Sequence, residues 1–355
     1  MACGPDDLPT LAGPAPDHGP HPGRRRSGRT RLNTWSRIGI LAATLLGLTI
    51  AAWTIGDVGL TQIAQTARRM GPGGFAAICA WSLFTSALLG GAWHSAAPGE
   101  PPRRVVLFAW ARLVRDGASN LLPFSELGAI LIGWRTLIGA SVPAPRVYSS
   151  FVVDLTTEMA SQVVYTLFSL LAIAPLLAGS GAAELRPAII GGTAVMIGLI
   201  VLFFTMQPVV LALAARIAAR FLPGATVLAE VQAELSRTYA MRGHVFAAFL
   251  FNLAAWTATG TGSWFMLELM GSDIALWKVL SLEGLIFTLR SIAFFVPGAI
   301  GVQEAGYLFV APLFGLAPEA ALALSLGKRA RDMLIGAAAL LIWQIRESRA
   351  LIAQR

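Results

Sequence analysis

Apolar stretches long enough to cross a lipid bilayer follow one another along most of the chain after Ile38. A helix needs roughly 20 apolar residues to cross about 30 Å of hydrocarbon, and windows of that length recur. The strict alternation of apolar and polar residues that barrel strands require is nowhere sustained. The pattern therefore predicts an all-α integral membrane protein.

Six of the stretches are continuous enough to be interpreted as full spans. They are residues 38–56, 74–93, 148–177, 187–206, 244–270 and 318–343. Two further apolar regions, 105–138 and 274–315, are interrupted by proline, glycine and charged residues. Interrupted backbone is tolerated at membrane depth only where protein or trapped water satisfies it, which favours re-entrant hairpins over tight pairs of spans.

The order of these segments repeats in the two halves of the chain. Each half contains a span, a broken hairpin and a second span, first from Gly74 to Leu177 and then from His244 to Trp343. Basic residues at the segment ends orient the two halves in opposite senses, which is the arrangement of an inverted-topology repeat. A plain bundle of eight spans with kinked helices is the alternative that the pattern leaves open.

The remaining segments divide the rest of the chain. Residues 1–34 predict a disordered, basic cytoplasmic tail, because they are rich in Pro and Gly and contain the run RRRSGRTR. Residues 35–345 form the predicted membrane domain, in which 207–242 is expected to be an amphipathic cytoplasmic connector. The first span lacks a convincing cleavage site and is expected to be retained. Residues 346–355 are expected to be a second cytoplasmic tail, which places both termini in the cytoplasm.

Composition argues against several other classes of protein. Hydrophobic residues make up 55% of the 355 residues and charged residues 13%, a balance that does not suit a water-soluble globule. The net charge of +8 lies at the ends of apolar segments, where membrane topology explains it, so we expect no nucleic-acid partner. The histidines are too dispersed for a metal cluster or a catalytic pair, and no Walker A pattern follows a strand. We therefore expect no cofactor, no metal and no enzymatic activity.

The sequence FFVPGAIGVQEAG, residues 294–306, interrupts the second broken region. We expect Pro297 to end one helix, the turn from Gly298 to Gly301 to bring bare backbone close to another element, and a new helix to begin near Val302. The free amides of the new helix would form a small anion site at membrane depth. A proline kink between packed helices, with glycines that permit close contact, is the other interpretation.

Charged side chains at membrane depth indicate a polar centre. Asp154 and Glu158 are four residues apart and share one helix face. The last span contains Lys328, Arg329, Arg331 and Asp332. Opposite charges at matching positions of the two halves predict a paired or shared centre, because isolated charges are costly in hydrocarbon. The alternative is that these groups pair only to fix helix packing.

Further charged residues lie near the breaks or near the predicted span ends. Arg115, Arg290 and Glu304 lie beside the breaks and are candidates to contact a headgroup or relay a proton. The charged residues nearer the predicted ends, which we expect at the membrane interface, are Glu126, Arg135, Glu268 and Glu283.

Three stretches resemble one family of membrane proteins. They are VRDGASNLLPFSELG (residues 114–128), VVDLTTEMASQ (152–162), and FFVPGAIGVQEAGY running on to LSLGKRARDMLIG (294–336). These stretches are similar to the flippase-like transmembrane region of lysylphosphatidylglycerol synthases and their stand-alone relatives, most closely to the subgroup associated with hopanoid biosynthesis. The resemblance implies a multi-pass protein of the bacterial inner membrane that moves a lipid or isoprenoid-derived molecule between leaflets. Aminoacyl transfer belongs to a separate soluble domain of the synthases, so we expect no synthase activity here.

The resemblance also points to individual residues. They are Arg115, Asn120, Pro123, Asp154, Glu158, Gln162, Pro297, Gly298, Gly301, Glu304, Lys328, Arg329 and Asp332. One departure is visible in the first hairpin, where relatives often carry an acidic residue just after the glycines. Here Ala129 and Ile130 follow Gly128, and the acid is Glu126.

The leading hypothesis is a lipid translocator in which a polar cavity takes the headgroup while the apolar part of the lipid stays in the bilayer. The basic residues expected to attract the headgroup are Arg115, Arg290, Lys328 and Arg329, and the acids expected to couple movement to protons are Asp154, Glu158 or Glu304. The second hypothesis is a membrane scaffold that recruits lipid-synthesis enzymes and transports nothing. A third, an intramembrane lipid-modifying enzyme, lacks a recognisable catalytic group.

Overall fold

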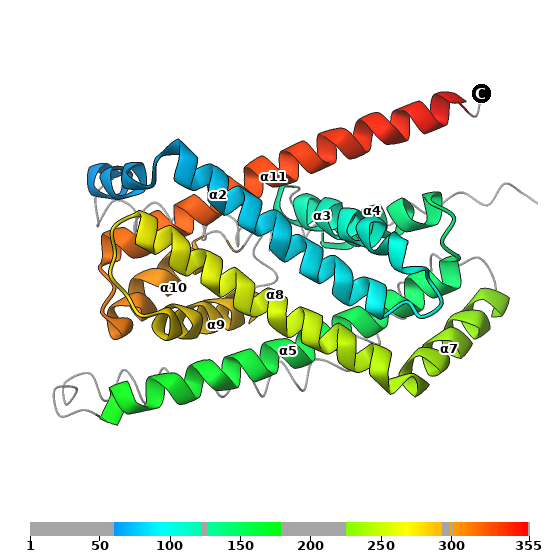
Figure 1. Ribbon diagram of the computed structural model, residues 1–355, viewed down its shortest axis with the longest axis horizontal. Coiled ribbons are helices and arrows are strands. Elements are labelled where there is room, and N and C mark those ends of the chain that lie inside the picture. Colours follow the sequence, from blue (N-terminus) through cyan, green and yellow to red (C-terminus); the bar gives the residue numbers. More distant parts are fainter. Residues whose placement is uncertain (1–59, 122–125, 179–224, 293–298, 300, 354–355) are drawn as a thin grey trace, which may run out of the picture.

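The computed structural model describes residues 60–121, 126–178, 225–292, 299 and 301–353 (Figure 1). The expected N-terminal tail and the expected spans 38–56 and 187–206 lie outside the described residues. Within the described part the chain forms helices and turns and no strand, which confirms the helical prediction.

Nine α-helices and two 3₁₀ helices make up the described part of the chain. The α-helices are α2 (Leu60–Ser95), α3 (Val105–Leu121), α4 (Glu126–Gly139), α5 (Ala144–Ala178), α7 (Ala225–Ala240), α8 (Arg242–Leu269), α9 (Leu276–Ile292), α10 (Val302–Val310) and α11 (Pro318–Ala353). The 3₁₀ helices are η1 (Pro102–Arg104) and η3 (Ala311–Phe314). The two broken regions of the sequence thus become the helix pairs α3/α4 and α9/α10.

Helix lengths bear on the predicted spans. Residues Ala67–Ser95 and Arg242–Leu269 combine the length and apolar character needed to cross a bilayer. Helices α5 and α11 are also long, at 35 and 36 residues, but they carry the charged residues described below. Helix α11 runs on to Ala353, so residues 346–353 of the expected cytoplasmic tail continue this helix.

Helix α2 is bent where glycine and proline meet. Gly71 has φ 65° and ψ 171°, outside the helical region, and Pro72 has no N–H to donate. A proline is accommodated in the first turn of a new helical segment, where its missing N–H would have no partner in any case. The bend lies just before Gly74, the residue at which the sequence predicts that a span begins.

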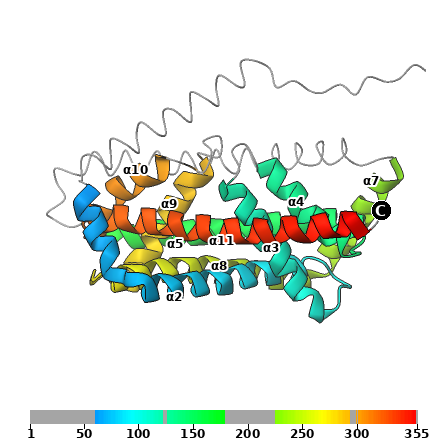
Figure 2. The same ribbon diagram turned by 90° about the horizontal axis from the view of Figure 1, so that it is seen from above.

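Helices α2 and α8 lie side by side and run antiparallel (Figures 1 and 2). Trp81 Nε1 in α2 donates a hydrogen bond to Ala258 O in α8 at 2.7 Å. At the other end, a ring nitrogen of His244 lies 3.2 Å from Ser95 O. Glycine permits this close packing, since a Cβ at Gly262 would lie 2.7 Å from Trp81 Cδ1. The first helix of one half thus opposes the first helix of the other.

The two halves share one pattern of helix packing. Helix α3 packs against α11, and its counterpart α9 packs against α5. In the same way α5 packs against α8, and α11 packs against α2. Exchanging α2–α5 with α8–α11 therefore reproduces the same neighbours. At the crossing of α3 and α11 a Cβ on Gly117 would lie 2.8 Å from the Cα of Gly336, so the two backbones almost touch.

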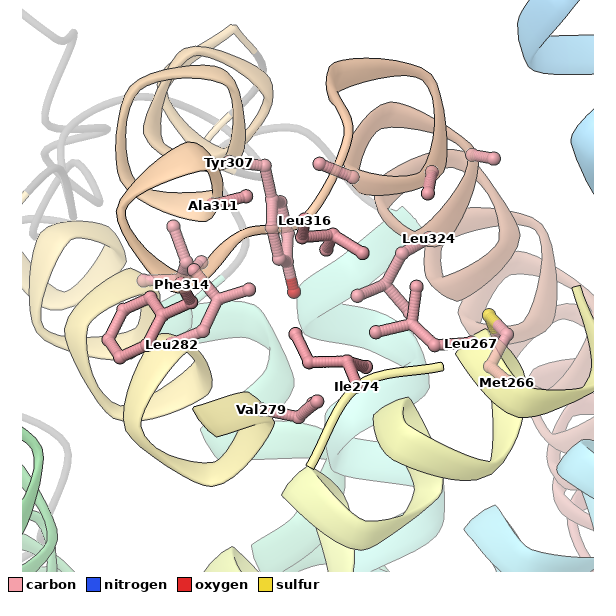
Figure 3. Packing of buried hydrophobic residues seen from close by; sticks show 14 of the residues in the cluster. Met266, Leu267, Ile274, Val279, Leu282, Tyr307, Ala311, Phe314, Leu316 and Leu324 are labelled. Carbon is pink, nitrogen blue, oxygen red and sulfur yellow. The ribbon is translucent and has the colours of Figure 1, made fainter. Parts of the chain in front are cut away.

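Two apolar clusters lie inside the described part of the bundle. In the first half Trp93, Phe108, Leu137 and Phe151 pack together from α2, α3, α4 and α5. In the second half the cluster includes Met266, Leu282, Tyr307, Phe314 and Leu324 from α8, α9, α10, η3 and α11 (Figure 3). Close packing of this kind fixes the helices that carry the charged side chains.

Candidate functional site

A first polar cluster is centred on Arg112 of α3, a residue that the sequence analysis did not select. Its side chain is 4% exposed. Arg112 Nε donates to Asp116 at 3.1 Å, Nη1 donates to Asp154 at 3.1 Å, and Nη2 donates to Glu158 at 2.7 Å. A guanidinium presents five donors in a rigid fork and stays charged, so one arginine can hold several carboxylates together. The only sequence signal was the spacing of Arg112 and Asp116, four residues apart in an apolar segment.

Two groups beside this cluster retain free hydrogen-bonding capacity. Arg115 lies over the Phe151 ring at 5.0 Å, and its Nη1, 4.0 Å from Asp154 Oδ2, is buried without a hydrogen-bond partner in the described part of the chain. Asn252 of α8 is fully buried and donates to Thr157 Oγ1 at 3.1 Å. Its Oδ1 has no partner among the described residues. An unmade buried hydrogen bond costs about 1–3 kcal/mol, so these atoms are suited to a ligand.

A second polar cluster joins α9, α10 and α11. Lys328 of α11 forms an ion pair with Glu283 of α9. The Tyr307 hydroxyl on α10 donates to Glu283 Oε1 at 2.5 Å and accepts from Lys328 Nζ at 2.9 Å. Glu283, which the sequence analysis expected near the membrane interface, is 2% exposed and lies inside the helix bundle. Its carboxylate is buried because Lys328 and Tyr307 satisfy both of its oxygens.

At the start of α10, an acidic side chain of the helix accepts a hydrogen bond from the backbone amide that precedes it. The helix begins at Val302, as the sequence predicts, after Gly301 with φ 80°. Gly301 N–H donates to Glu304 Oε2 at 2.8 Å, while Glu304 Oε1 accepts from Arg329 at 2.8 Å and from Ser325 at 3.3 Å. The sequence predicts free amides for an external anion here. For Gly301 this prediction is wrong, because its amide already donates a hydrogen bond to the Glu304 carboxylate.

The expected pairing of Asp154 and Glu158 with the basic residues of the last span is also wrong. The two acids are held by Arg112, and Lys328 is held by Glu283, so each charge is neutralised within its own half. Neither α3 and α5 nor α9 and α11 are among the closely packed helix pairs of the described part. The long side chains of Arg112 and Lys328 cross the space between α3 and α5 and between α9 and α11. The structure thus contains two polar centres in place of one shared centre.

The two ion pairs occupy equivalent positions with opposite polarity. Arg112 lies seven residues after the first residue of α3, and Glu283 lies seven residues after the first residue of α9. Asp154 and Lys328 each lie ten residues after the first residues of α5 and α11. The cation therefore comes from the shorter helix in the first half and from the longer helix in the second.

Polar side chains continue along α5 beyond the first cluster. Gln162 Nε2 donates to Ser291 Oγ on α9 at 2.6 Å. The Thr166 and Thr288 hydroxyls are hydrogen-bonded at 2.7 Å, five residues beyond Glu283 on α9. Twelve residues separate Asp154 from Thr166, so this polar seam between α5 and α9 extends about 18 Å from the first cluster towards the second.

The remaining candidate residues make no ion pair or hydrogen bond with the two clusters in the described part of the chain, or they lie outside the described residues. Asn120 is exposed on α3. Arg290 is half-buried, with its guanidinium 5.8 Å from the Phe287 ring centroid. Asp332 accepts from its neighbour Arg331 at 2.7 Å. The positions Pro123, Pro297 and Gly298 lie outside the described residues.

A third network lies at the end of the bundle where α7 docks. Arg146 Nη1 donates to Glu100 at 2.7 Å and its Nε donates to Glu234 of α7 at 2.9 Å. Arg104 also donates to Glu100 at 2.7 Å. Burial raises the pKa of Glu100, but the hydrogen bonds from Arg146 and Arg104 outweigh burial and hold that pKa below its ordinary value. This network ties the loop after α2 and the start of α5 to the expected connector.

The outer surface of the bundle is apolar. Large hydrophobic side chains that are strongly exposed include Phe84, Leu171, Phe246 and Leu341. Exposed apolar side chains around buried charges are typical of helical membrane proteins.

The chain belongs to the family of the lysylphosphatidylglycerol synthase transmembrane region, whose family model matches residues 40–339. No curated protein and no solved structure matches the chain.

Proposed function

We propose that this protein translocates a lipid between the leaflets of the bacterial inner membrane and that it is not an enzyme. The observation that carries the proposal is the polar seam between α5 and α9, which extends from the Arg112 cluster towards the Lys328 cluster. Buried ion pairs contribute little to stability compared with apolar packing of similar volume. Charged and polar groups kept at bilayer depth therefore favour a pathway over a purely structural role.

The helix arrangement supports a transporter that works by rocking two inverted halves. The halves repeat one packing pattern, and their first helices run antiparallel. In this arrangement six full spans accompany two re-entrant hairpins, α3/α4 and α9/α10, and both termini lie in the cytoplasm. The polar centres then lie near the middle of the bilayer, between the moving halves.

The headgroup would bind first beside the Arg112 cluster. Arg115 Nη1 supplies a free donor for a phosphate or another polar oxygen, and Asn252 Oδ1 supplies a free acceptor. Acyl chains or polycyclic rings would stay in the surrounding lipid. The resemblance to the hopanoid-associated subgroup favours a hopanoid or another isoprenoid lipid, with phospholipids as the other candidate class.

Reconstitution into vesicles tests the proposal. Fluorescent lipids of each class are incorporated, and the fraction that a membrane-impermeant reductant reaches is followed over time. We expect the protein to accelerate exchange of at least one lipid, and Arg115→Gln to slow it. Arg135→Gln is the matched control, because Arg135 is 58% exposed and pairs with Glu347, which belongs to neither cluster.

Failure to accelerate exchange of every lipid tested would contradict translocation. The scaffold alternative would then predict that substitutions on α7 abolish function in cells, while Arg115→Gln leaves it intact.

A further inference from the structure

The two equivalent ion pairs differ in whether their cation can lose its proton. Arg112 keeps its charge at any ordinary pH and is held by three carboxylates. Lys328 is an amine, which can lose its proton when buried, and Glu283 is the carboxylate that it contacts. The cation of the first cluster therefore keeps its charge, whereas both members of the second ion pair can become neutral.

The geometry of the second cluster suits proton transfer. Lys328 Nζ, Glu283 and the Tyr307 hydroxyl form a closed triangle of hydrogen bonds, and the lysine and glutamate are 4% and 2% exposed. If the proton moves from nitrogen to carboxylate, the neutral acid donates to the neutral amine, and the triangle persists. Removing both charges also lowers the cost of keeping these groups away from water.

Charged and titratable groups from four helices lie within electrostatic range of the pair. The charged and titratable groups in electrostatic range are Tyr165 from α5, Arg290 from α9, Tyr307 from α10 and Arg331 from α11. The two arginines place further positive charge around the ion pair. The Tyr165 hydroxyl is buried without a hydrogen-bond partner in the described part of the chain, and it lies beside Gly260 of α8.

We propose that Lys328, Glu283 and Tyr307 form a proton-exchange site that couples lipid movement to a proton gradient, an inference that rests on the proposed translocation. In the first step the bond from Nζ to one hydrogen breaks and a bond from Glu283 Oε2 to that hydrogen forms, leaving the electron pair on nitrogen. The acid then releases the proton towards the seam, and the amine takes up a proton from the opposite side. One proton crosses per cycle, and the original ion pair is restored.

The test measures lipid exchange and proton flux in the same vesicles. The protein is reconstituted into phosphatidylethanolamine and phosphatidylglycerol vesicles that enclose a pH-sensitive dye. Acyl-labelled fluorescent phosphatidylglycerol, phosphatidylethanolamine and a hopanoid are tested in turn. We expect wild-type exchange to depend on an imposed pH gradient and to be accompanied by proton movement.

Lys328→Arg is the sharpest variant, because it keeps the positive charge but cannot release a proton. We expect it to lose both the gradient dependence and the proton flux while retaining residual exchange. Tyr307→Phe keeps the aromatic ring in the core and removes only the bridging hydroxyl, so it should reduce proton flux. Arg135→Lys is the matched control and should behave as the wild type. Size-exclusion chromatography identifies the variants that remain folded. A folded Lys328→Arg or Tyr307→Phe variant is enough to carry out the test.

The outcomes separate the inference from the proposed function. Wild-type exchange that is indifferent to the gradient, with no proton flux, overturns the coupling and leaves translocation standing. Persistence of gradient dependence and flux in a folded Lys328→Arg variant, or a flux equal to that of the wild type in a folded Tyr307→Phe variant, also overturns it. If the wild type moves none of the labelled lipids, translocation and coupling fall together.

Discussion

Removal of the Arg112 side chain is the most direct perturbation of the first polar cluster. Arg112→Ala deletes five hydrogen bonds at once and leaves Asp116, Asp154 and Glu158 close together. Breaking one partner from a buried ion pair costs about 3–5 kcal/mol, because the remaining charge is left without compensation. Asp154 is fully buried, so we expect a loss in that range.

A rescue series separates lost charge compensation from lost packing. Arg112→Met keeps much of the volume, and combining it with Asp154→Asn and Glu158→Gln removes two of the uncompensated charges. We expect this triple variant to recover most of the stability, since apolar and neutral replacements of buried ion pairs are often close to neutral. Arg112→Lys should be intermediate, because one ammonium cannot reach three carboxylates in the geometry of a guanidinium.

Stability is measured by unfolding the purified protein from mild detergent with increasing sodium dodecyl sulfate, followed by tryptophan fluorescence. Arg135→Ala serves as the control, because its pair with Glu347 is exposed and should change stability by less than about 1 kcal/mol. If Arg112→Ala were no less stable than Arg135→Ala, the view that the cluster needs Arg112 to balance its charge would be refuted.

Three further predictions concern packing, pH and orientation. Gly117→Ala should destabilise the protein by about 1–3 kcal/mol in the same unfolding assay, because its Cβ would meet the backbone of α11 at 2.8 Å and force the helices apart. Glu100→Gln should lower the melting temperature by a constant amount above the ordinary carboxyl pKa of 4.5. Because the pKa of Glu100 is lowered in the folded state, its contribution to stability is lost as pH falls through that lower pKa. The difference in melting temperature between variant and wild type should then disappear. A difference that persisted at low pH would contradict the role of the carboxylate. A single cysteine at Ser272, on a background without native cysteines, should react with an impermeant thiol reagent added outside the cell, whereas one at Glu230 should be protected; the reverse result would invert the proposed topology.

The sequence by itself determined the helices and most of their limits. Apolar runs of fixed length predicted spans at 148–177 and 244–270, and the structure has α5 at Ala144–Ala178 and α8 at Arg242–Leu269. Proline and glycine placed the start of α10 at Val302, since both residues act on the backbone locally. These features are encoded within a few neighbouring residues, so no knowledge of distant contacts was needed.

Only the tertiary structure decided which charges meet. The sequence showed that Asp154 and Lys328 need partners at membrane depth, but it suggested that the two halves supply them to each other. Packing places Arg112 opposite Asp154 and Glu283 opposite Lys328, and it buries a carboxylate that the sequence placed at the interface. The reason is physical: the cost of burying a charge can be deduced from the residue type, whereas the partner that offsets it depends on the approach of helices far apart in the chain.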